Sequence, residues 1–358
     1  MRLVVVVVAH DNEGTIAQLG SDLRQAAGPG DAVIVVDNAS SDATAARARE
    51  TGLEVLETGT NLGFGGGCRI GAGASDAPLL LFLNPDARID RAALERLRAV
   101  ADEQPDWAAW QPVVMLPDGR INSAGGVVHF LGLSWAGQCG QAAANLRAEP
   151  YEAPFASGAA LVVRRSAWDE LGGFDDDYFL YGEDLELGLR LWLAGRRVGV
   201  EPRARVIHDY EFDKGLQKWF LLERNRWRTL LAVYPASLLA LLVPALIAAE
   251  IGLLVIAARG GWLSAKLRAN LATLAGLPGA LRRRRLVQAT RALPARAFCA
   301  QLSASLESPY LVQLPRALVR AQALYFVVAR MLLRLPISTA VTIARSDGGQ
   351  RSGQREAP

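Results

Sequence analysis

Acidic and aromatic side chains are concentrated between Gly172 and Glu186. Six carboxylates and four aromatic rings fall within these fifteen positions. A core segment would not carry so many carboxylates, because unpaired charge is costly to bury, and a solvated loop would not carry so many rings. The combination predicts a cleft that holds an ionised carboxylate, from Glu183 or Asp184, against a substrate. Acidic residues also favour the first turn of a helix, so an ordinary helix N-terminus is the alternative.

Further candidate groups follow apolar runs of the sequence. Asp37 comes directly after the run at 32–36, and Asp86 comes shortly after the run at 79–83. The first carboxylate could accept hydrogen bonds from the base or ribose of a nucleotide, and the second could hold Mg²⁺ or Mn²⁺ against a diphosphate. His208, at the end of a later run, could complete the metal shell. The structural alternatives are ordinary turns for the two carboxylates and a buried histidine for His208.

The glycine-rich segment 61–67 (Asn-Leu-Gly-Phe-Gly-Gly-Gly) is predicted to be a loop that opens a helix. Such a loop can bring backbone N–H groups close to phosphates. It is not a Walker loop, because no Gly-Lys-Ser/Thr follows. It also differs from the Rossmann fingerprint, because it follows the third predicted strand rather than the first.

The elements that would position these groups alternate along the chain. Apolar runs without polar alternation are typical of parallel strands that helices cover on both faces. We therefore expect an α/β fold with a Rossmann-like mixed sheet, in which ligands bind beyond the carboxyl ends of the strands. Strands are predicted at 3–9, 32–36, 53–56, 79–83, 108–115, 161–164, 198–200 and 205–208, and helices at 15–27, 43–50, 68–75, 89–100 and 183–194.

The order of these motifs resembles that of the family 2 glycosyltransferases, which have the GT-A fold. The resemblance covers about residues 1–230, and within the family the chain looks like the rhamnosyltransferase-like enzymes that build bacterial surface polysaccharides. The motifs that carry the resemblance lie at 5–15, 36–42, 61–65, 82–86, 157–160 and 173–191.

The resemblance implies inverting transfer of a sugar, with rhamnose suggested by the branch, from a nucleotide-diphosphate donor to a lipid-linked or glycan acceptor. Asp184 would be the general base, with Glu183 beside it as a second catalytic residue. Asp86 and His208 would hold Mg²⁺ or Mn²⁺. The nucleotide-sugar site would comprise His10, Asp11, Glu13, Asp37, Asn38, Asn61, Gly63, Gly65, Asn84 and Asp86, and the acceptor site Tyr178, Tyr181 and Glu186.

The chain also departs from the family pattern. Residues 223–227 (Glu-Arg-Asn-Arg-Trp) only approximate the Gln-x-x-Arg-Trp of processive synthases, which argues against a polymerase that extrudes its product. The turn at 10–15 begins with His-Asp where the family often has Tyr-Asn. Two alternatives stay open: a nucleotidyltransferase, which would be expected to carry a basic glycine-rich signature in that turn, and a non-catalytic, membrane-associated nucleotide-sugar-binding protein.

The net charge of +3 conceals a strong asymmetry. Residues 1–213 carry a charge of −13, whereas residues 214–358 carry +16. A basic region rich in Leu and Ala, with few aromatic residues to stack on bases, favours an anionic membrane surface over nucleic acid. We therefore predict a catalytic domain at 1–213, a basic, apolar helical region at 214–344 that associates with the cytoplasmic face of the cell membrane, and a disordered tail at 345–358.

Residues 235–258 are mostly apolar and long enough to span a bilayer. Pro244 and Glu250 interrupt them, so a spanning helix, a re-entrant helix, peripheral attachment and a buried helix of a soluble subdomain all stay open. The arginine run at 282–285 and the amphipathic pattern at 309–336 suit anionic headgroups. The three cysteines lie far apart, which fits a reducing compartment and argues against a disulfide framework.

Overall fold

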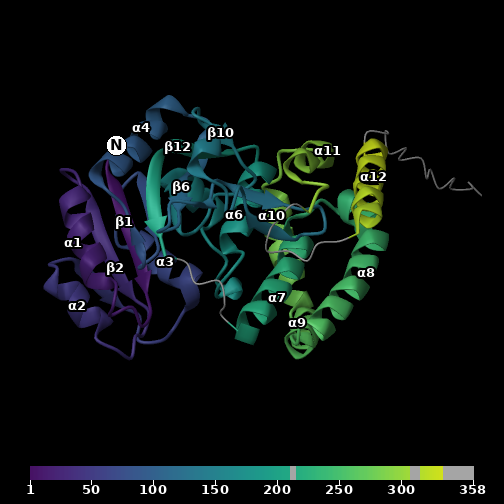
Figure 1. Cartoon of the computed structure of the whole chain (residues 1–358), viewed down its shortest axis with the longest axis horizontal. Coiled ribbons are helices and arrows are strands. Elements are labelled where there is room, and N and C mark those ends of the chain that lie inside the picture. The colour runs from purple at the N-terminus through teal and green to yellow at the C-terminus, as the bar shows by residue number, and fades with distance from the viewer. Residues whose placement is uncertain (210–214, 307–314, 334–358) are drawn as a thin grey trace, which may run out of the picture.

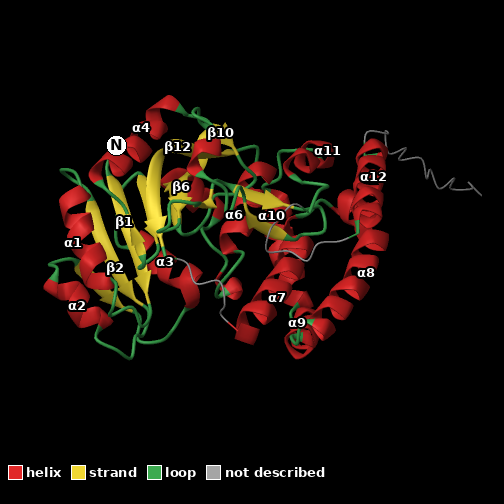
Figure 2. Cartoon of the chain, in the orientation of Figure 1, coloured by secondary structure: helices red, strands yellow, loops and turns green. Residues whose placement is uncertain are grey.

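The computed structural model describes residues 1–209, 215–306 and 315–333. Its centre is a ten-stranded mixed sheet with the strand order β10-β12-β6-β11-β4-β1-β2-β3, in which β5 pairs with β12 and β7 with β6 (Figure 2). The first four strands run parallel, and β11 runs antiparallel between β4 and β6. The strands are β1 (Leu3–Ala9), β2 (Ala32–Asp37), β3 (Glu54–Glu57), β4 (Leu79–Leu83), β5 (Ala87–Arg88), β6 (Trp107–Met115), β7 (Ile121–Ser123), β10 (Tyr151–Glu152), β11 (Ala160–Arg164) and β12 (Arg197–His208), with a separate pair formed by β8 (Gly126–Val128) and β9 (Ser134–Ala136).

Helices cover both faces of this sheet, which confirms the predicted α/β fold. Alternate side chains of β1 point to opposite faces, as in any strand. Val5 packs in the core beneath α1 and α4, whereas Val6 packs beneath α3, α5 and α6. The helices of this part are α1 (Ile16–Ala26), α2 (Thr44–Glu50), α3 (Gly63–Gly73), α4 (Arg91–Glu103), α5 (Arg165–Leu171) and α6 (Glu183–Leu193), with short 3₁₀ turns at Ala143–Asn145 and Asp176–Tyr178.

The glycine-rich segment is a helix rather than the predicted loop, since α3 already begins at Gly63. Its glycines allow the helix to lie directly on the sheet. A Cβ atom at Gly67 would lie 2.5 Å from Val8 Cγ1, and one at Gly71 would lie 2.3 Å from Val6 Cγ1. The low helix propensity of glycine is therefore overridden by close packing against β1.

The two short strands predicted at 198–200 and 205–208 form a single long strand, β12. Its pairing with β6 shifts register between Glu201 and Arg205. Pro202 falls within this irregularity and lacks the backbone N–H that a regular ladder needs. The strand therefore continues past the interruption to His208, at the carboxyl edge of the sheet.

The helices after residue 214 pack against the first part of the chain (Figure 1). They are α7 (Gly215–Val233), α8 (Ala236–Arg259), α9 (Leu263–Ala275), α10 (Leu277–Ala289), α11 (Ala295–Phe298) and α12 (Arg316–Leu332), with a 3₁₀ turn at Cys299–Gln301. One buried cluster joins the two parts, because it contains Phe130 and Leu189 together with Leu230, Leu242 and Phe326. The C-terminal helices are thus built onto the sheet domain through a common core.

Two predicted features of the C-terminal region fall partly or wholly outside the described residues. The tail at 345–358 lies outside them, and so do the two ends of the amphipathic segment 309–336, whose centre is α12. Within the described residues, α8 is the one helix whose length and composition would allow it to cross a membrane, with a mean hydropathy of 2.6. The three cysteines are free and buried.

Candidate active site

Asp184 lies in the first turn of α6, where the helix meets the carboxyl edge of the sheet. Gly182 precedes it with a left-handed φ of 86°, which lets the chain turn sharply into the helix. Two backbone N–H groups hold the carboxylate: Gly158 donates to Oδ2 at 2.9 Å, and Leu185 donates to Oδ1 at 2.7 Å. The N-terminus of α6 adds a favourable field for negative charge. Asp184 is therefore held in a fixed orientation while it stays partly exposed.

Glu183 is buried beside Asp184. Its Oε2 atom accepts no hydrogen bond from the part of the chain that the structure describes. Burial, and then the charge of Asp184, raises the pKa of Glu183 to about 8. Burial also raises the pKa of Asp184, while the N–H groups of Gly158 and Leu185 act in the opposite direction. We assign the single proton of the pair at neutral pH to Glu183, which leaves Asp184 ionised and able to accept a proton.

Asn84, Asp86 and His208 converge at the ends of β4 and β12. Asp86 Oδ1 lies 3.0 Å from His208 Nε2, and Asn84 Nδ2 lies 3.1 Å from the same nitrogen. The pairing of β5 with β12, which sets Ala87 opposite His208, brings these distant segments together. The structure thus brings together the two residues that were predicted from the sequence to bind a metal.

The Asp86–His208 pair suits a divalent cation in the chemistry of its donors, since carboxylate oxygen and imidazole nitrogen both bind Mn²⁺, and the carboxylate binds Mg²⁺. Among the described residues, no group of three or more acidic, histidine or cysteine side chains could hold a metal. The protein would therefore supply two ligands, and donor phosphates and water would supply the rest, as is common for Mg²⁺.

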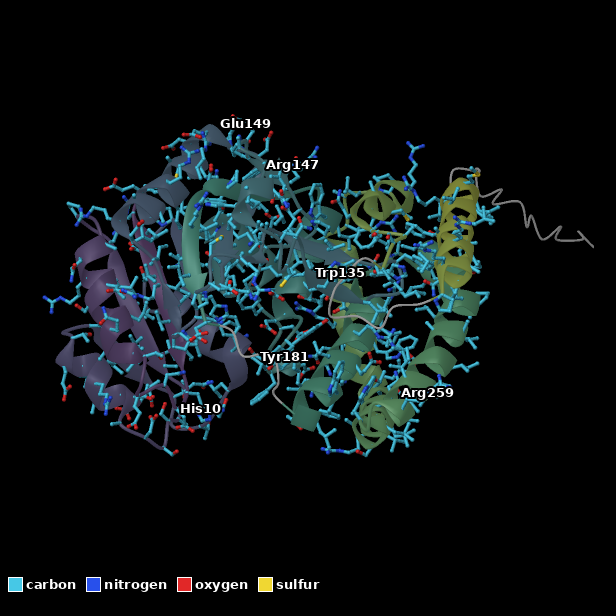
Figure 3. All side chains as sticks on the ribbon, in the orientation of Figure 1. His10, Trp135, Arg147, Glu149, Tyr181 and Arg259 are labelled. Carbon is cyan, nitrogen blue, oxygen red and sulfur yellow. The ribbon has the colours of Figure 1, made fainter. Side chains whose placement is uncertain are left out.

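A cavity of about 440 Å³ connects the two groups. Its wall includes Asn84 and His208 from the strand ends, and Glu183 and Asp184 from α6. Tyr181 and Trp135 line it as well (Figure 3). A second cavity, of about 690 Å³, lies against α1 and β12 and contains none of the predicted site residues. The smaller cavity is therefore the candidate active site.

Asp37 lies at the same edge of the sheet, at the end of β2. β1 separates β2 from β4, so the ends of β2 and β4 are roughly 10 Å apart. Asp37 is buried, and its Oδ2 accepts a hydrogen bond from the Ser40 N–H at 3.3 Å. Its buried Oδ1 has no hydrogen-bond donor among the described residues. A buried acceptor in this state suits a ligand that brings an N–H or O–H group.

Asp11 and Glu13, which were predicted to contact the nucleotide sugar, bind backbone groups of the protein instead. Asp11 Oδ1 accepts from the Ser41 N–H at 2.7 Å, and Glu13 Oε2 accepts from the Ala43 N–H at 3.2 Å. These carboxylates join the turn after β1 to the turn after β2. His10 is exposed at the rim of the sheet, apart from Tyr181 (Figure 3). None of the three residues lines the 440 Å³ cavity.

Asn38, Asn61 and Gly63 join the end of β2 to the start of α3. The Asn38 amide donates to Asn61 Oδ1 and to the Gly63 carbonyl, each at 3.1 Å. Gly63 has a φ of 74°, and a Cβ atom there would lie 2.2 Å from the Phe179 carbonyl oxygen. Gly65 is also closely packed, because a Cβ atom there would lie 3.2 Å from Phe174 Cβ. These four residues therefore have a structural role, since they fix how the start of α3 packs at the edge of the sheet.

The acidic and aromatic segment divides its residues between the cavity and the core. Tyr181 lines the cavity, whereas Tyr178 is buried and its hydroxyl pairs with Thr229 Oγ1 at 2.8 Å. Glu186 is fully buried, and its carboxylate binds Arg190 at 2.7 Å and Arg283 at 3.3 Å. The structure therefore brings Tyr181 to the candidate acceptor site, but not Tyr178 or Glu186.

Helix α7 supplies a wall of the cavity that the sequence motifs did not predict. The amide of Asn225 lies within 2.6–3.0 Å of the carbonyl oxygens of Tyr178, Leu180 and Tyr181. This contact holds a loop in which both Phe179 and Tyr181 have left-handed φ values. The nearest sequence signal is the 223–227 motif, which contains Asn225. The other cavity residues from α7 are Lys218, Trp219, Leu222, Glu223, Arg226 and Thr229.

Comparison with known proteins identifies the family. The sequence model described as "Glycosyl transferase family 2" matches residues 4–172. An N-acetylglucosaminyl-diphospho-decaprenol L-rhamnosyltransferase of Mycobacterium tuberculosis is 34% identical over 208 residues, which cover 51% of this chain and 68% of that protein. The chain belongs to glycosyl transferase family 2. A further relative of this glycosyltransferase, the O-antigen biosynthesis protein RfbC of Myxococcus xanthus, is 33% identical over 142 residues, which cover 36% of this chain and 11% of that protein.

Solved structures show the same fold. GalNAc-T7, crystallised with UDP, GalNAc and Mn²⁺, has a TM-score of 0.55 at 19% identity, covering 65% of this chain and 48% of that one. TarS of S. aureus has a TM-score of 0.52 at 17% identity, and the match covers 93% of this chain and 55% of that one. These likenesses confirm the GT-A fold. The family match and the relatives support a glycosyltransferase.

Proposed function

We propose that this glycosyltransferase moves a sugar, with rhamnose as the first candidate, from a nucleotide-diphosphate donor to a lipid-linked acceptor with inversion of the anomeric carbon. One observation supports this most strongly. The Asp184 carboxylate, held by the Gly158 N–H, lines the same cavity as Asn84 and His208, which adjoin Asp86. A general base and a candidate diphosphate site therefore face one space.

The proposed reaction is a single displacement. The acceptor hydroxyl oxygen forms a bond to the anomeric carbon while the bond from that carbon to the diphosphate oxygen breaks. Asp184 takes the proton of the hydroxyl. Because the acceptor attacks from the face opposite the leaving group, the configuration inverts. Glu183, protonated beside it, limits the negative charge next to the base.

The donor would lie along the edge of the sheet. Asp86 and His208 would hold Mg²⁺ or Mn²⁺, which when bound offsets the negative charge that develops on the leaving diphosphate. Asp37, with its unpartnered Oδ1, would accept an N–H or O–H group of the nucleotide. The other residues that were predicted to bind the nucleotide sugar would act indirectly, by fixing the shape of this edge. They are His10, Asp11, Glu13, Asn38, Asn61, Gly63 and Gly65.

The acceptor would enter beside α7. Trp135, Trp219 and Leu222 give this side of the cavity an apolar surface, which suits a lipid-linked sugar. The name of the mycobacterial relative includes a lipid-linked sugar, N-acetylglucosaminyl-diphospho-decaprenol. We place the enzyme at the cytoplasmic face of the cell membrane, because that leaflet is anionic and the C-terminal helices are basic and include the apolar helix α8.

A panel of nucleotide sugars tests the proposal. Each donor is incubated with a GlcNAc-diphosphate-lipid acceptor, with and without Mn²⁺ or Mg²⁺, and the product is examined by proton NMR. We expect one donor to be consumed in a metal-dependent reaction and the new glycosidic bond to have the inverted configuration. A retained configuration would contradict the mechanism, and a panel without transfer to this acceptor would contradict the proposed acceptor class.

A further inference from the structure

Helix α8 presents two different faces. Leu238, Leu242 and Leu246 are buried in the core that joins the C-terminal helices to the sheet domain. A second row, also at four-residue intervals, is exposed: Val243 (48%), Ile247 (56%), Ile251 (61%) and Val255 (44%). Only 11% of the residues in its most apolar window are fully buried, so this apolar helix is largely half-buried or exposed.

Glu250 anchors the inner face of α8 to its neighbours. Its carboxylate binds Arg226 of α7 and, at 2.7 Å, Lys266 of α9, and it accepts a hydrogen bond from Trp227 Nε1 at 3.1 Å. Glu223 closes the cluster by binding both Arg226 and Lys266. Glu250 is half-buried, its partners are buried, and all four charges are mutually paired, which explains the acidic residue within an apolar helix.

This cluster argues against a spanning helix. Glu250 lies about 21 Å along the helix from Ala236, close to the depth of the bilayer centre if α8 crossed it. Its partners Arg226 and Lys266 would have to enter the hydrocarbon as well, together with the charged helices that carry them. A single charged side chain at that depth already costs about 2.5–3.5 kcal/mol. Association through the exposed face requires none of these transfers.

Helix α12 extends the exposed apolar surface. Phe326 faces inward and stacks on Phe130 with a ring separation of 4.7 Å, and the Tyr325 hydroxyl donates to a carbonyl of α8. The exposed apolar side chains of α12 include Leu324, Val327, Val328 and Met331. Helices α8 and α12 form the edge of the molecule that lies farthest from α1 and α2 (Figure 1). We call the four residues Val243, Ile247, Ile251 and Val255 of α8, together with Leu324, Val327, Val328 and Met331 of α12, the outer face.

The charge of the region identifies the partner of this face. Residues 236–333 contain twelve Lys and Arg residues and two Glu residues. Arg259 lies at the end of α8 (Figure 3), and further exposed arginines are Arg268, Arg282, Arg285, Arg316 and Arg320. A second copy of the chain would bring the same positive charge, whereas an anionic bilayer brings the opposite charge and an apolar interior.

We propose that the outer face lies in one leaflet of an anionic membrane, with α8 parallel to the surface rather than across it. Its apolar side chains would enter to about 5–10 Å, while the arginines contact the headgroups. The proposal deepens the proposed function, because a lipid-linked acceptor would be met at the same surface. Its test does not require transfer, so the two can fail separately.

Thiol labelling distinguishes the two orientations of α8. Single cysteines are introduced by Ala236→Cys and Arg259→Cys, at exposed positions on either end of the helix, while the three native cysteines are buried. The full chain is bound to vesicles of phosphatidylglycerol and phosphatidylcholine and treated with a membrane-impermeant maleimide. We expect both ends to react from the outside, equally before and after detergent. Protection of one end until detergent is added would show a spanning helix and overturn the proposal.

Flotation with the same vesicles tests the outer face itself. The double variant Ile247→Glu/Ile251→Glu should lower the bound fraction roughly tenfold or more, and vesicles of phosphatidylcholine alone should bind the wild type less. Ile70→Glu, at an exposed isoleucine of α3, is the matched control and should float like the wild type. A wild-type chain that does not float, or that forms a dimer which the double variant dissociates, would overturn the proposal.

Discussion

Gly158 and Asp184 are joined by a 2.9 Å hydrogen bond between the start of β11 and the start of α6. Together with the bond from the Leu185 N–H, it holds the carboxylate at the cavity wall. A Cβ atom at Gly158 would lie 3.2 Å from the Phe64 ring and 3.6 Å from Asp184 Oδ2. Three segments that are distant in sequence therefore meet at the proposed general base.

Glu183 should make the stability of the fold depend on pH. Its pKa is raised from 4.5 to about 8, so between these values the folded state binds more protons than the unfolded state. The free energy of unfolding should therefore fall as pH rises through this window, by up to about 1.4 kcal/mol per pH unit, and then level off. Glu183→Gln should remove this slope. Urea unfolding of both proteins from pH 4.5 to 9 measures it, and parallel curves would contradict the assignment.

Asp86 and His208 should be required for metal-dependent binding of the donor. Asp86→Asn and His208→Gln each remove one of the two proposed ligands and should weaken Mn²⁺-dependent binding of a nucleoside diphosphate roughly tenfold or more. Isothermal titration with and without Mn²⁺ measures the effect without any turnover. Asp76→Asn, which removes an exposed carboxylate paired with Arg2, is the control. Unchanged metal dependence in both ligand variants would place the cation elsewhere.

Gly63→Ala should be strongly destabilising, because the residue has a left-handed φ and the new Cβ would meet the Phe179 carbonyl oxygen. We expect a loss of about 2–4 kcal/mol. Gly73→Ala is the matched control: it lies at the other end of α3, and nothing lies within 4 Å of its Cβ position. This change should stay within about 1 kcal/mol of the wild type. Equal effects on the chemical denaturation midpoints would show that the contact with Phe179 is unimportant.

Glu250→Ala should destabilise the C-terminal helices by about 3 kcal/mol, because it leaves Lys266 and Arg226 buried with less compensation. Glu170→Ala breaks the exposed pair with Arg196 and should cost under about 1 kcal/mol. Thermal unfolding of the two variants provides the comparison. A Glu250 variant as stable as the Glu170 variant would mean that the buried cluster adds nothing to the packing of α8.

Local patterns along the sequence were sufficient to predict the sheet and the residues at its edge. Apolar runs gave the parallel strands, and carboxylates directly after those runs placed Asp37 and Asp86 at one edge of the sheet. The acidic and aromatic segment identified the start of α6 and hence Asp184. These features depend on near neighbours in the chain, which is why they can be read without the structure.

Contacts over long sequence distances could not be predicted in the same way. The contacts of the Asn225 amide with the carbonyl oxygens of the Tyr181 loop depend on how α7 packs against that loop. No local pattern in the sequence specifies this packing. Glu186 shares the acidic segment with Asp184, but the turn of α6 directs it to Arg190 and away from the cavity. Of the four arginines at 282–285, Arg283 and Arg284 bind inner groups, and only the outer two suit headgroups.

The turnover of Asp184→Asn tests the central claim most directly. The change keeps the shape of the side chain and an oxygen that can accept the Gly158 N–H, but it removes the base. We expect kcat to fall by about 10²–10⁴-fold while binding of the nucleoside diphosphate with Mn²⁺ is retained. A variant that folds, binds the donor and transfers sugar at the wild-type rate would show that Asp184 does not take the proton of the acceptor.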